Sequence, residues 1–278
     1  TCSFCAIPLM RGRHVSKPIE ELVKEAGNLV KKGVKEVMLI AQELTYYGLD
    51  IYKRRMLPDL LHRLADIKGL EWIRLHYAYP SKFPLEILNV MKERDNICNY
   101  LDMPLQHAAN NMLKAMKRHI TREEMEELIT AVREKVPGIC LRTTLIAGFP
   151  GETENDVEEL KEFLIQQRFD RVGIFTYSHE EGTSGFALTD DVSAEKKERR
   201  AQEIMEVQQG ISFELNQQKV GKVFKTLIDK KEAGRYLGRT EFDSVEVDNE
   251  VLIHSSKKLP IGEFVNVTHE GLAKRYAL

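Results

Sequence analysis

The chain has 278 residues, enough for a large core with a small appended domain. Its formal net charge of −2 excludes a basic field over the whole molecule that would attract nucleic acid. Four cysteines in a chain of this length exclude a disulfide scaffold. We find no signal peptide and no apolar run of membrane-span length, so we expect a cytoplasmic location and no membrane partner.

The first part of the chain alternates between predicted helices and strands. Helices are predicted at 16–32, 58–67, 84–94, 121–136 and from Thr153 onward, with Ser16 and Thr153 as N-caps and Asp156 as the partner of Thr153. Strands are predicted at 34–41, 72–76, 100–103, 140–147 and 171–175. Strands that recur every ~30 residues with helices between them are typical of parallel βαβ units.

A long charged helix at 193–219 is followed by a different pattern. Strand-like runs at 223–228, 245–253 and 264–267 are separated by turns that contain glycine. This pattern predicts a small all-β barrel, with the charged helix as the bridge to it.

Cys2 and Cys5 form a Cys-x-x-Cys pair. Such a pair is ambiguous by itself, since it occurs in zinc sites, in redox pairs and in iron–sulfur motifs. A zinc site would need a second Cys/His pair, and none has the matching spacing. A redox pair would follow a strand and begin a helix, and neither is predicted here. Cys98 and Cys140 are expected to be structural, because buried, inert thiols are common.

The neighbours of this pair resolve the ambiguity through a resemblance. The signature of the radical S-adenosylmethionine superfamily is Cys-x-x-x-Cys-x-aromatic-Cys, and Cys2, Phe4 and Cys5 resemble its second half. The resemblance implies that Cys2 and Cys5 are metal ligands of a 4Fe–4S cluster and that Phe4 lies at the cofactor. The open iron would bind S-adenosylmethionine, whose reductive cleavage gives a 5′-deoxyadenosyl radical. No catalytic residue beyond the cluster is expected.

Further motifs resemble the methylthiotransferase branch of that superfamily, in the same order along the chain. They are Ala-Ile-Pro at 6–8, Arg-Gly-Arg at 11–13, Ala-Gln-Glu at 41–43, Tyr-Leu-Asp-Met-Pro-Leu-Gln-His at 100–107, Arg-Thr-Thr at 142–144, Gly-Phe-Pro-Gly-Glu-Thr at 148–153 and Phe-Thr-Tyr-Ser at 175–178.

The resemblance implies an α/β fold: a partial (β/α)6 TIM-like barrel of the radical SAM type with a small C-terminal all-β barrel of the TRAM type. It divides the chain into a radical SAM domain at 1–219, with its first strand missing and 193–219 as the bridging helix, and a TRAM-like barrel at 220–278. The family also has an N-terminal domain that holds a second 4Fe–4S cluster. We expect this chain to lack that domain and therefore to be unable, alone, to hold its cluster normally or to complete the reaction.

Most of the candidate cofactor contacts follow predicted strands. Ligands of parallel α/β folds bind beyond the carboxyl ends of the strands. Gly148 can also be explained as part of a tight turn, and Gln106 with His107 as a satisfied polar pair. Arg142 needs an anionic partner, either the cofactor's carboxylate or a nearby Asp102 or Glu152. The full set of expected contacts is Phe4, Gln42, Glu43, Gln106, His107, Arg142, Ile146, Gly148 and Tyr177.

Two relatives within the family differ in substrate. One methylthiolates the β-carbon of an aspartate in small-subunit ribosomal protein number twelve, and the other methylthiolates an adenosine in transfer RNA. Residues 241–250 contain five acidic side chains and no basic one, which favours a basic protein partner over nucleic acid. The sequence therefore predicts the ribosomal-protein enzyme, with S-adenosylmethionine as radical source and methyl donor and a reducing electron donor as a further partner. The transfer-RNA enzyme is the alternative, and an RNA-binding scaffold is the weaker non-enzyme alternative.

Overall fold

Five parallel strands form the larger sheet of the protein, in the order β1-β2-β3-β4-β5. The structure is a computed structural model that describes residues 2–271. The last residues of the expected second domain, 272–278, lie outside the described part. The strands are β1 (Glu36–Leu39), β2 (Trp72–Leu75), β3 (Ile97–Asp102), β4 (Cys140–Ala147) and β5 (Arg171–Thr176).

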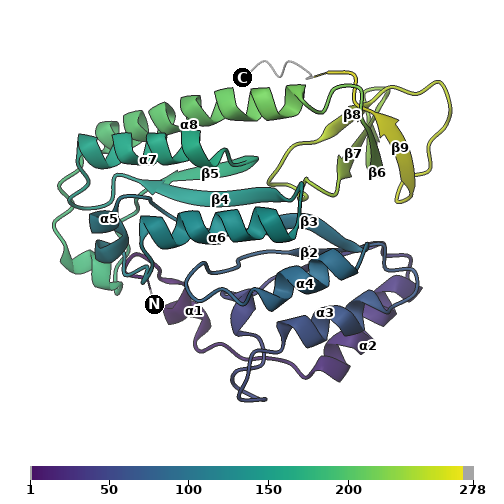
Figure 1. Cartoon of the computed structure of the whole chain (residues 1–278), viewed down its shortest axis with the longest axis horizontal. Helices are drawn as coiled ribbons and strands as arrows, with labels where there is room; N and C mark the ends of the chain where they lie inside the picture. Colours follow the sequence, from purple (N-terminus) through teal and green to yellow (C-terminus); the bar gives the residue numbers. More distant parts are fainter. Residues whose placement is uncertain (1, 272–278) are drawn as a thin grey trace.

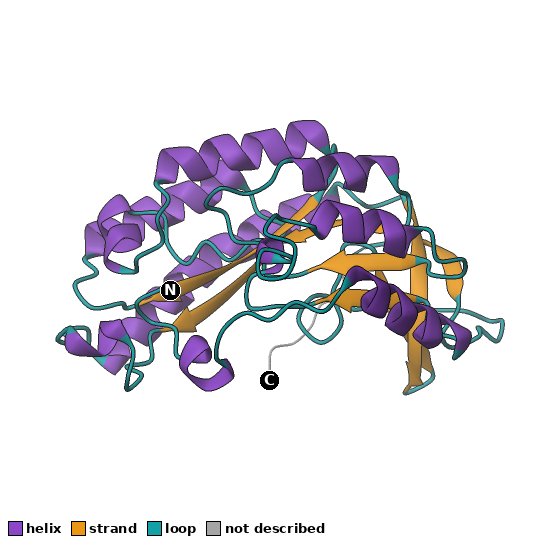
Figure 2. Ribbon diagram, turned by 90° about the horizontal axis from the view of Figure 1, so that it is seen from below, coloured by secondary structure: helices purple, strands orange, loops and turns teal. Residues whose placement is uncertain are grey.

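Helices connect these strands and lie along the outer side of the sheet, as Figures 1 and 2 show. Within residues 2–271, no helix combines the length and the apolar character that a membrane span requires. The helices are α1 (Ile7–Arg11), α2 (Ile19–Lys31), α3 (Leu57–Ala65), α4 (Glu86–Glu93), α5 (Asn110–Ala115), α6 (Arg122–Lys135), α7 (Glu154–Gln167) and α8 (Ala194–Gln217), with short 3-10 turns η1 (Leu44–Tyr46) and η2 (Ser184–Ala187).

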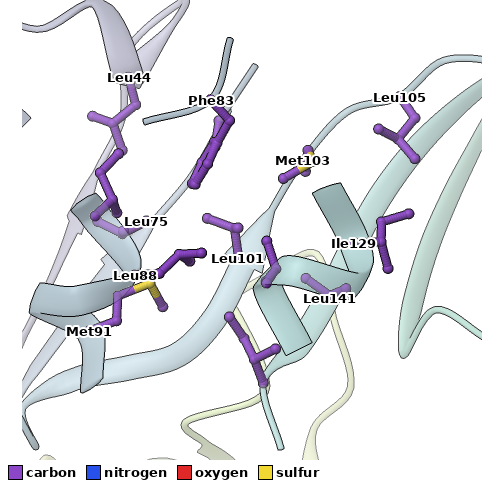
Figure 3. Close-up of a cluster of buried hydrophobic side chains, with 14 of the residues drawn as sticks. Leu44, Leu75, Phe83, Leu88, Met91, Leu101, Met103, Leu105, Ile129 and Leu141 are labelled. Carbon is purple, nitrogen blue, oxygen red and sulfur yellow. The ribbon is translucent and has the colours of Figure 1, made fainter. Parts of the chain in front are cut away.

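The helix-facing side of the sheet is apolar. Leu75, Leu101 and Leu141 are at most 2% exposed and pack against side chains of the covering helices, among them Leu88 and Ile129 (Figure 3). Successive side chains of a strand point to opposite faces, so one apolar residue in two is enough to build this core. Burial of that apolar surface is the main force that holds the helices on the sheet.

The other, concave side of the same strands is polar. The alternate positions of the strands hold charged or polar side chains, among them Glu36, Arg74, Asp102, Arg142 and Arg171. Arg74 and Asp102 have no exposed surface at all. Buried charges are stable only when they are paired, so this face needs partners from elsewhere in the chain.

Some of these charges pair within the same face, as Glu36 does with Arg74. The other partners come from the second sheet and its loops, which pack on the amino ends of the parallel strands. Trp72, Cys98 and Cys140 at these ends form one apolar cluster with Leu227, against which Phe264 packs. Figure 1 shows this sheet at the side of the molecule opposite the N terminus. It is antiparallel, with the order β8-β7-β6-β9, and comprises β6 (Val223–Glu232), β7 (Arg235–Thr240), β8 (Val251–Ile253) and β9 (Phe264–Thr268).

The structure corrects two predicted elements. Ser16 is not an N-cap, because α2 begins at Ile19 after Pro18, and the Ser16 hydroxyl instead accepts a hydrogen bond from the Gly48 amide at 3.0 Å. The strand expected at 245–253 is confined to Val251–Ile253, and β7 was not predicted. The Thr153 cap is confirmed, with its Asp156 partner in a capping box.

Only part of the acidic run at 241–250 is exposed as the expected acidic surface, at Glu246 and Glu250. The carboxylate of Asp243 pairs with Arg171 at 2.7 Å, and that of Asp248 accepts a hydrogen bond from the Tyr100 hydroxyl at 2.7 Å. Glu241 accepts a hydrogen bond from the Asn99 amide at 3.0 Å. Three of the five acidic residues therefore bind groups of the larger sheet, and Asp243 and Asp248 pair with arginines of its concave face.

Candidate cluster and cofactor site

The cysteine pair lies in a tight turn that precedes α1. Cys2 and Cys5 are free thiols and half-buried, and the amide of Cys5 donates to the carbonyl of Cys2 at 3.4 Å. Ser3 between them is 2% exposed. Its amide donates to the Met116 carbonyl at 3.0 Å, and its own carbonyl accepts from the Gly185 amide at 2.6 Å. The turn is thus fixed between the end of α5 and the start of η2, although these segments are far apart in sequence.

Arg118 faces this turn from the end of α5. Its side chain donates to Cys2 Sγ at 3.0 Å and to the Pro104 carbonyl, and it lies 4.3 Å from the centre of the Tyr79 ring. The residue is 3% exposed, and its Nε has no hydrogen-bond partner. Burial raises the pKa of the Tyr79 hydroxyl to about 12, so this ring stays neutral beside the guanidinium.

A cavity of about 200 Å³ opens at the carboxyl ends of β4 and β5, next to Phe4 of the cysteine turn. Four of the expected cofactor contacts line it: Phe4, Gln106, Ile146 and Tyr177. The remaining lining residues are Thr144, Phe175, Thr176, Ser178 and Glu180. The wall is therefore mainly neutral, with apolar and aromatic surface on which a flat ring can lie.

Gln106 is held at this cavity by its backbone. Its amide donates to the Thr144 carbonyl at 2.8 Å, and its carbonyl accepts from the Ile146 amide at 2.9 Å, so it extends the sheet next to β4. Its φ of 77° is unusual for a residue that is not glycine. Such strain occurs often at ligand sites. The amide side chain is one of the polar groups in the cavity wall.

His107 and Gly148 belong to a support network behind the cavity. His107 is fully buried, and its Nδ1 accepts from the Ala109 amide at 3.0 Å while Nε2 faces Glu152 Oε1 at 3.3 Å. The other oxygen of Glu152 accepts from the Gly148 amide at 2.8 Å and from Arg200 at 2.9 Å. His107 and Gln106 are not a polar pair, because their side chains point to different neighbours.

The glycine at 148 is explained by packing. Its φ is 79°, and a Cβ there would lie 2.2 Å from Cγ of Lys197 in α8. The ammonium of Lys197 pairs with Asp190 at 2.6 Å and lies 5.0 Å from the centre of the Tyr177 ring. Gly148 therefore lets α8 approach the loop that follows β4.

Arg142 lies deeper, away from the cavity. Its guanidinium contacts Asp102 at 2.8 Å and Asp248 at 3.4 Å, so two carboxylates of the chain meet its need for an anion. Burial opposes ionisation of Asp102, but the hydrogen bond from His76 and the charge of Arg142 outweigh burial and lower its pKa. Of the structural partners weighed for Arg142, Asp102 is present and Glu152 is engaged elsewhere.

The two candidates after β1 do not line the cavity. Glu43 caps η1, where its carboxylate accepts from the Thr45 amide at 2.9 Å and from the Tyr79 amide at 3.3 Å. Burial raises its pKa despite these hydrogen bonds. Gln42 is exposed. The structure thus brings together four of the nine expected cofactor contacts around one cavity.

Arg118 was not identified from the sequence, and Thr144 and Phe175, although part of the motifs at 142–144 and 175–178, were not among the expected cofactor contacts. Arg118 follows Met116 and Lys117 in an apparently ordinary basic stretch, and nothing in its spacing points to Cys2. Phe175 is 61% exposed, on the side of β5 that faces the cavity. Its exposure could not be read from the sequence, where it resembles a core residue.

The donor set of the cysteine turn fits an iron–sulfur cluster in part. Two free thiols share one turn, and the buried guanidinium of Arg118, which has no carboxylate partner within residues 2–271, points at one of them. Among residues 2–271 there is no group of three metal-ligating side chains, so the described part of the turn offers two thiols and no third ligand. A second cavity, of about 370 Å³, lies at the other end of β3 near Arg94 and Glu241, and neither Cys2 nor Cys5 lines it.

Comparisons with known proteins agree with this geometry. The family model described as the radical SAM superfamily matches residues 1–164, and the TRAM domain model matches residues 220–273. The coproporphyrinogen III oxidase HemN of Escherichia coli, a radical SAM enzyme, has a similar fold (TM-score 0.53, 16% identity, 82% of this chain and 60% of that chain). The radical SAM methyltransferase TsrM of Kitasatospora setae is similar at a TM-score of 0.51 and 19% identity, over 81% of this chain and 39% of that chain.

Curated relatives are much closer in sequence. The chain is 58% identical over 267 residues to the proteins named ribosomal protein uS12 methylthiotransferase RimO of Cytophaga hutchinsonii and Flavobacterium johnsoniae. The same-named protein of Bacteroides fragilis is 57% identical over 268 residues. Each match covers 96% of this chain but only 61% or 62% of the relative, so the chain spans about three fifths of the relatives' length. The chain belongs to the radical SAM superfamily, whose members use a 4Fe–4S cluster and S-adenosylmethionine.

Proposed function

We propose that this chain is the catalytic part of a methylthiotransferase that modifies the β-carbon of an aspartate in ribosomal protein uS12. The observation that carries the proposal is 58% identity to RimO proteins along 96% of the chain. The ordered motifs and the cavity beside the cysteine turn support it. We place a second cluster on an N-terminal domain, in the part of the relatives that this chain does not cover.

In this proposal Cys2 and Cys5 are two of the three ligands of the 4Fe–4S cluster. When bound, the cluster would supply an electron for the reductive cleavage of S-adenosylmethionine. Phe4, Ile146 and Tyr177 offer apolar and aromatic surface to the cofactor, and the Gln106 amide offers a donor and an acceptor. Enclosure between these side chains keeps water from the reacting groups.

The other expected contacts take indirect roles. Glu43, His107 and Gly148 hold the backbone around the cavity through the contacts described above. Arg142 stabilises the concave face together with Asp102. Gln42 would contact the cofactor only if its loop moved when the cofactor binds. We also propose the division into a radical SAM domain at 1–219 and a TRAM-like domain at 220–278.

The proposed protein partner rests on the similarity to RimO proteins and not on the charge of residues 241–250. Three of the five acidic side chains at 241–250 are used inside the protein, so this run is a poor argument for a basic protein partner. A reducing electron donor and a cytoplasmic location are part of the proposal, as the reaction and its substrate require.

The test is mass spectrometry of ribosomal protein uS12 and of total transfer RNA from a strain that lacks the gene. We expect the methylthio group on uS12 to be lost and the transfer-RNA mark to persist. Full-length protein should restore the mark, and its Cys2→Ala and Cys5→Ala variants should not. Cys98→Ala, which removes a buried thiol away from the site, is the matched control and should restore it. Loss of the transfer-RNA mark with an intact protein mark would overturn the choice of substrate.

A further inference from the structure

Arg118 carries a positive charge that no carboxylate of the described chain balances. Its exposed fraction is 3%, and none of the ion pairs found within residues 2–271 includes it. Other deeply buried arginines contrast with it. Arg74 pairs with Glu36 at 2.8 Å, and Arg171 pairs with Asp243 at 2.7 Å. A buried guanidinium without a counter-charge is costly, so an anion is missing from the surroundings of Arg118.

The direction of the side chain indicates where that anion belongs. One terminal nitrogen of Arg118 lies 3.0 Å from Cys2 Sγ, and the other donates to the Pro104 carbonyl. The face of the Tyr79 ring, at 4.3 Å, fixes the plane of the guanidinium. The group is therefore aimed at the sulfur by three contacts and has little freedom to turn away.

We infer that Arg118 is a positioning residue for the cluster, whose guanidinium hydrogen-bonds the Cys2 ligand and supplies the positive charge next to it. The inference rests on the proposed ligation of the cluster by Cys2. Hydrogen bonds to ligand sulfurs and nearby positive charge favour the reduced, more negative form of a cluster. Arg118 thus makes the cluster easier to reduce, which is the step that a radical SAM enzyme needs from its electron donor.

The experiment compares Arg118→Gln, Arg118→Lys and Lys117→Gln in the full-length protein, reconstituted with iron and sulfide under anaerobic conditions. Lys117→Gln is the matched control, because it removes the same positive charge from an exposed side chain, which contacts Ser184 at 2.9 Å. The readouts are iron content, the midpoint potential from a redox titration followed by electron paramagnetic resonance, and the melting temperature of the cluster-free protein.

We expect Arg118→Gln to shift the midpoint potential to a more negative value, Arg118→Lys to recover most of the shift, and Lys117→Gln to match the parent. Equal potentials in all variants that load iron overturn the inference. If both Arg118 variants fail to load iron, normal melting of their cluster-free forms supports it. If the melting temperatures of the cluster-free variants are instead lowered, Arg118 has a structural role and the inference is overturned. Failure of the parent itself to bind a cluster would count against the proposed function instead.

Discussion

The two ends of the parallel sheet are built on different principles. At the amino ends, buried charges are paired: Glu36 binds Arg74 and Arg239, and Arg171 binds Asp243. At the carboxyl ends, the cavity is lined mainly by neutral side chains, and within residues 2–271 the buried guanidinium of Arg118 has no carboxylate partner. Stability and function are thus separated along the strands, as in other parallel barrels.

The largest effect is expected when a buried charge pair at the amino ends of the strands is removed. Asp243→Asn leaves Arg171 buried without its counter-charge, which should lower the free energy of unfolding by about 3 kcal/mol or more. Urea denaturation followed by circular dichroism measures it. Glu246→Gln removes the same charge from an exposed position of the same run and should change the free energy by less than about 0.5 kcal/mol. Equal effects would mean that the pairing of Asp243 does not matter.

A smaller effect is expected at the junction of the cavity loop and α8. Gly148→Ala combines a positive φ with a clash against Lys197, and should cost about 2–4 kcal/mol. Gly151→Ala has a similar φ of 81° with no atom within 4 Å of the new Cβ, and should cost only about 1 kcal/mol. Thermal melting of the two variants gives the difference. If they melt alike, close packing of α8 does not explain the glycine.

A smaller effect is expected at the cavity, which lies at the carboxyl ends of β4 and β5. Gln106→Ala removes one amide from the cavity wall, and should weaken S-adenosylmethionine binding by about fivefold to tenfold, or ~1 kcal/mol, with little change in melting temperature. Equilibrium dialysis with the reconstituted full-length protein measures the affinity. Gln42→Ala, at an exposed site outside the wall, should bind as the parent does. The reverse result would place the cofactor at the loop after β1.

The smallest expected effect is a change of the free energy of unfolding with pH. The pKa of Asp102 is lower in the folded protein than in the unfolded chain. Its contribution to stability is therefore complete above the unfolded pKa of about 3.9 and is lost as the pH falls through the folded pKa. Urea denaturation between neutral and acid pH should show stability falling on acidification, and Asp102→Asn should flatten that slope. An unchanged slope would show that other carboxylates control it.

Local sequence signals predicted the five parallel strands and the longer helices, but not the short helices α1, which begins two residues after Cys5, and α5. The β-branched run of β4 and the capping box at Thr153 are complete within a few neighbouring residues. The loop after β7 could not be predicted in this way. Its conformation depends on Arg171 and Arg142, which lie about seventy to a hundred residues earlier, so alternating residues that resemble a strand form a turn instead.

The same limit applies to the site. Gln106, Ile146 and Tyr177 were found because parallel strands place their carboxyl ends together. Arg118 could not be found, since its relation to Cys2 spans 116 positions and uses a guanidinium where no motif required one. His107 and Glu43 were placed near the right loops, but the direction of their side chains is set by Glu152 and by the η1 turn.

The charge pairs of the paired end also govern how the chain can fold. Glu36 and Arg239 are 203 positions apart, and Met38 contacts Ser244 over 206 positions. Contacts of such sequence separation close large loops and form late. During synthesis the parallel sheet must therefore wait, with its arginines still hydrated, until the last quarter of the chain is available. We therefore expect the two regions that the family models delimit to unfold as one cooperative unit, and residues 2–219 alone to aggregate or to unfold without a sharp transition.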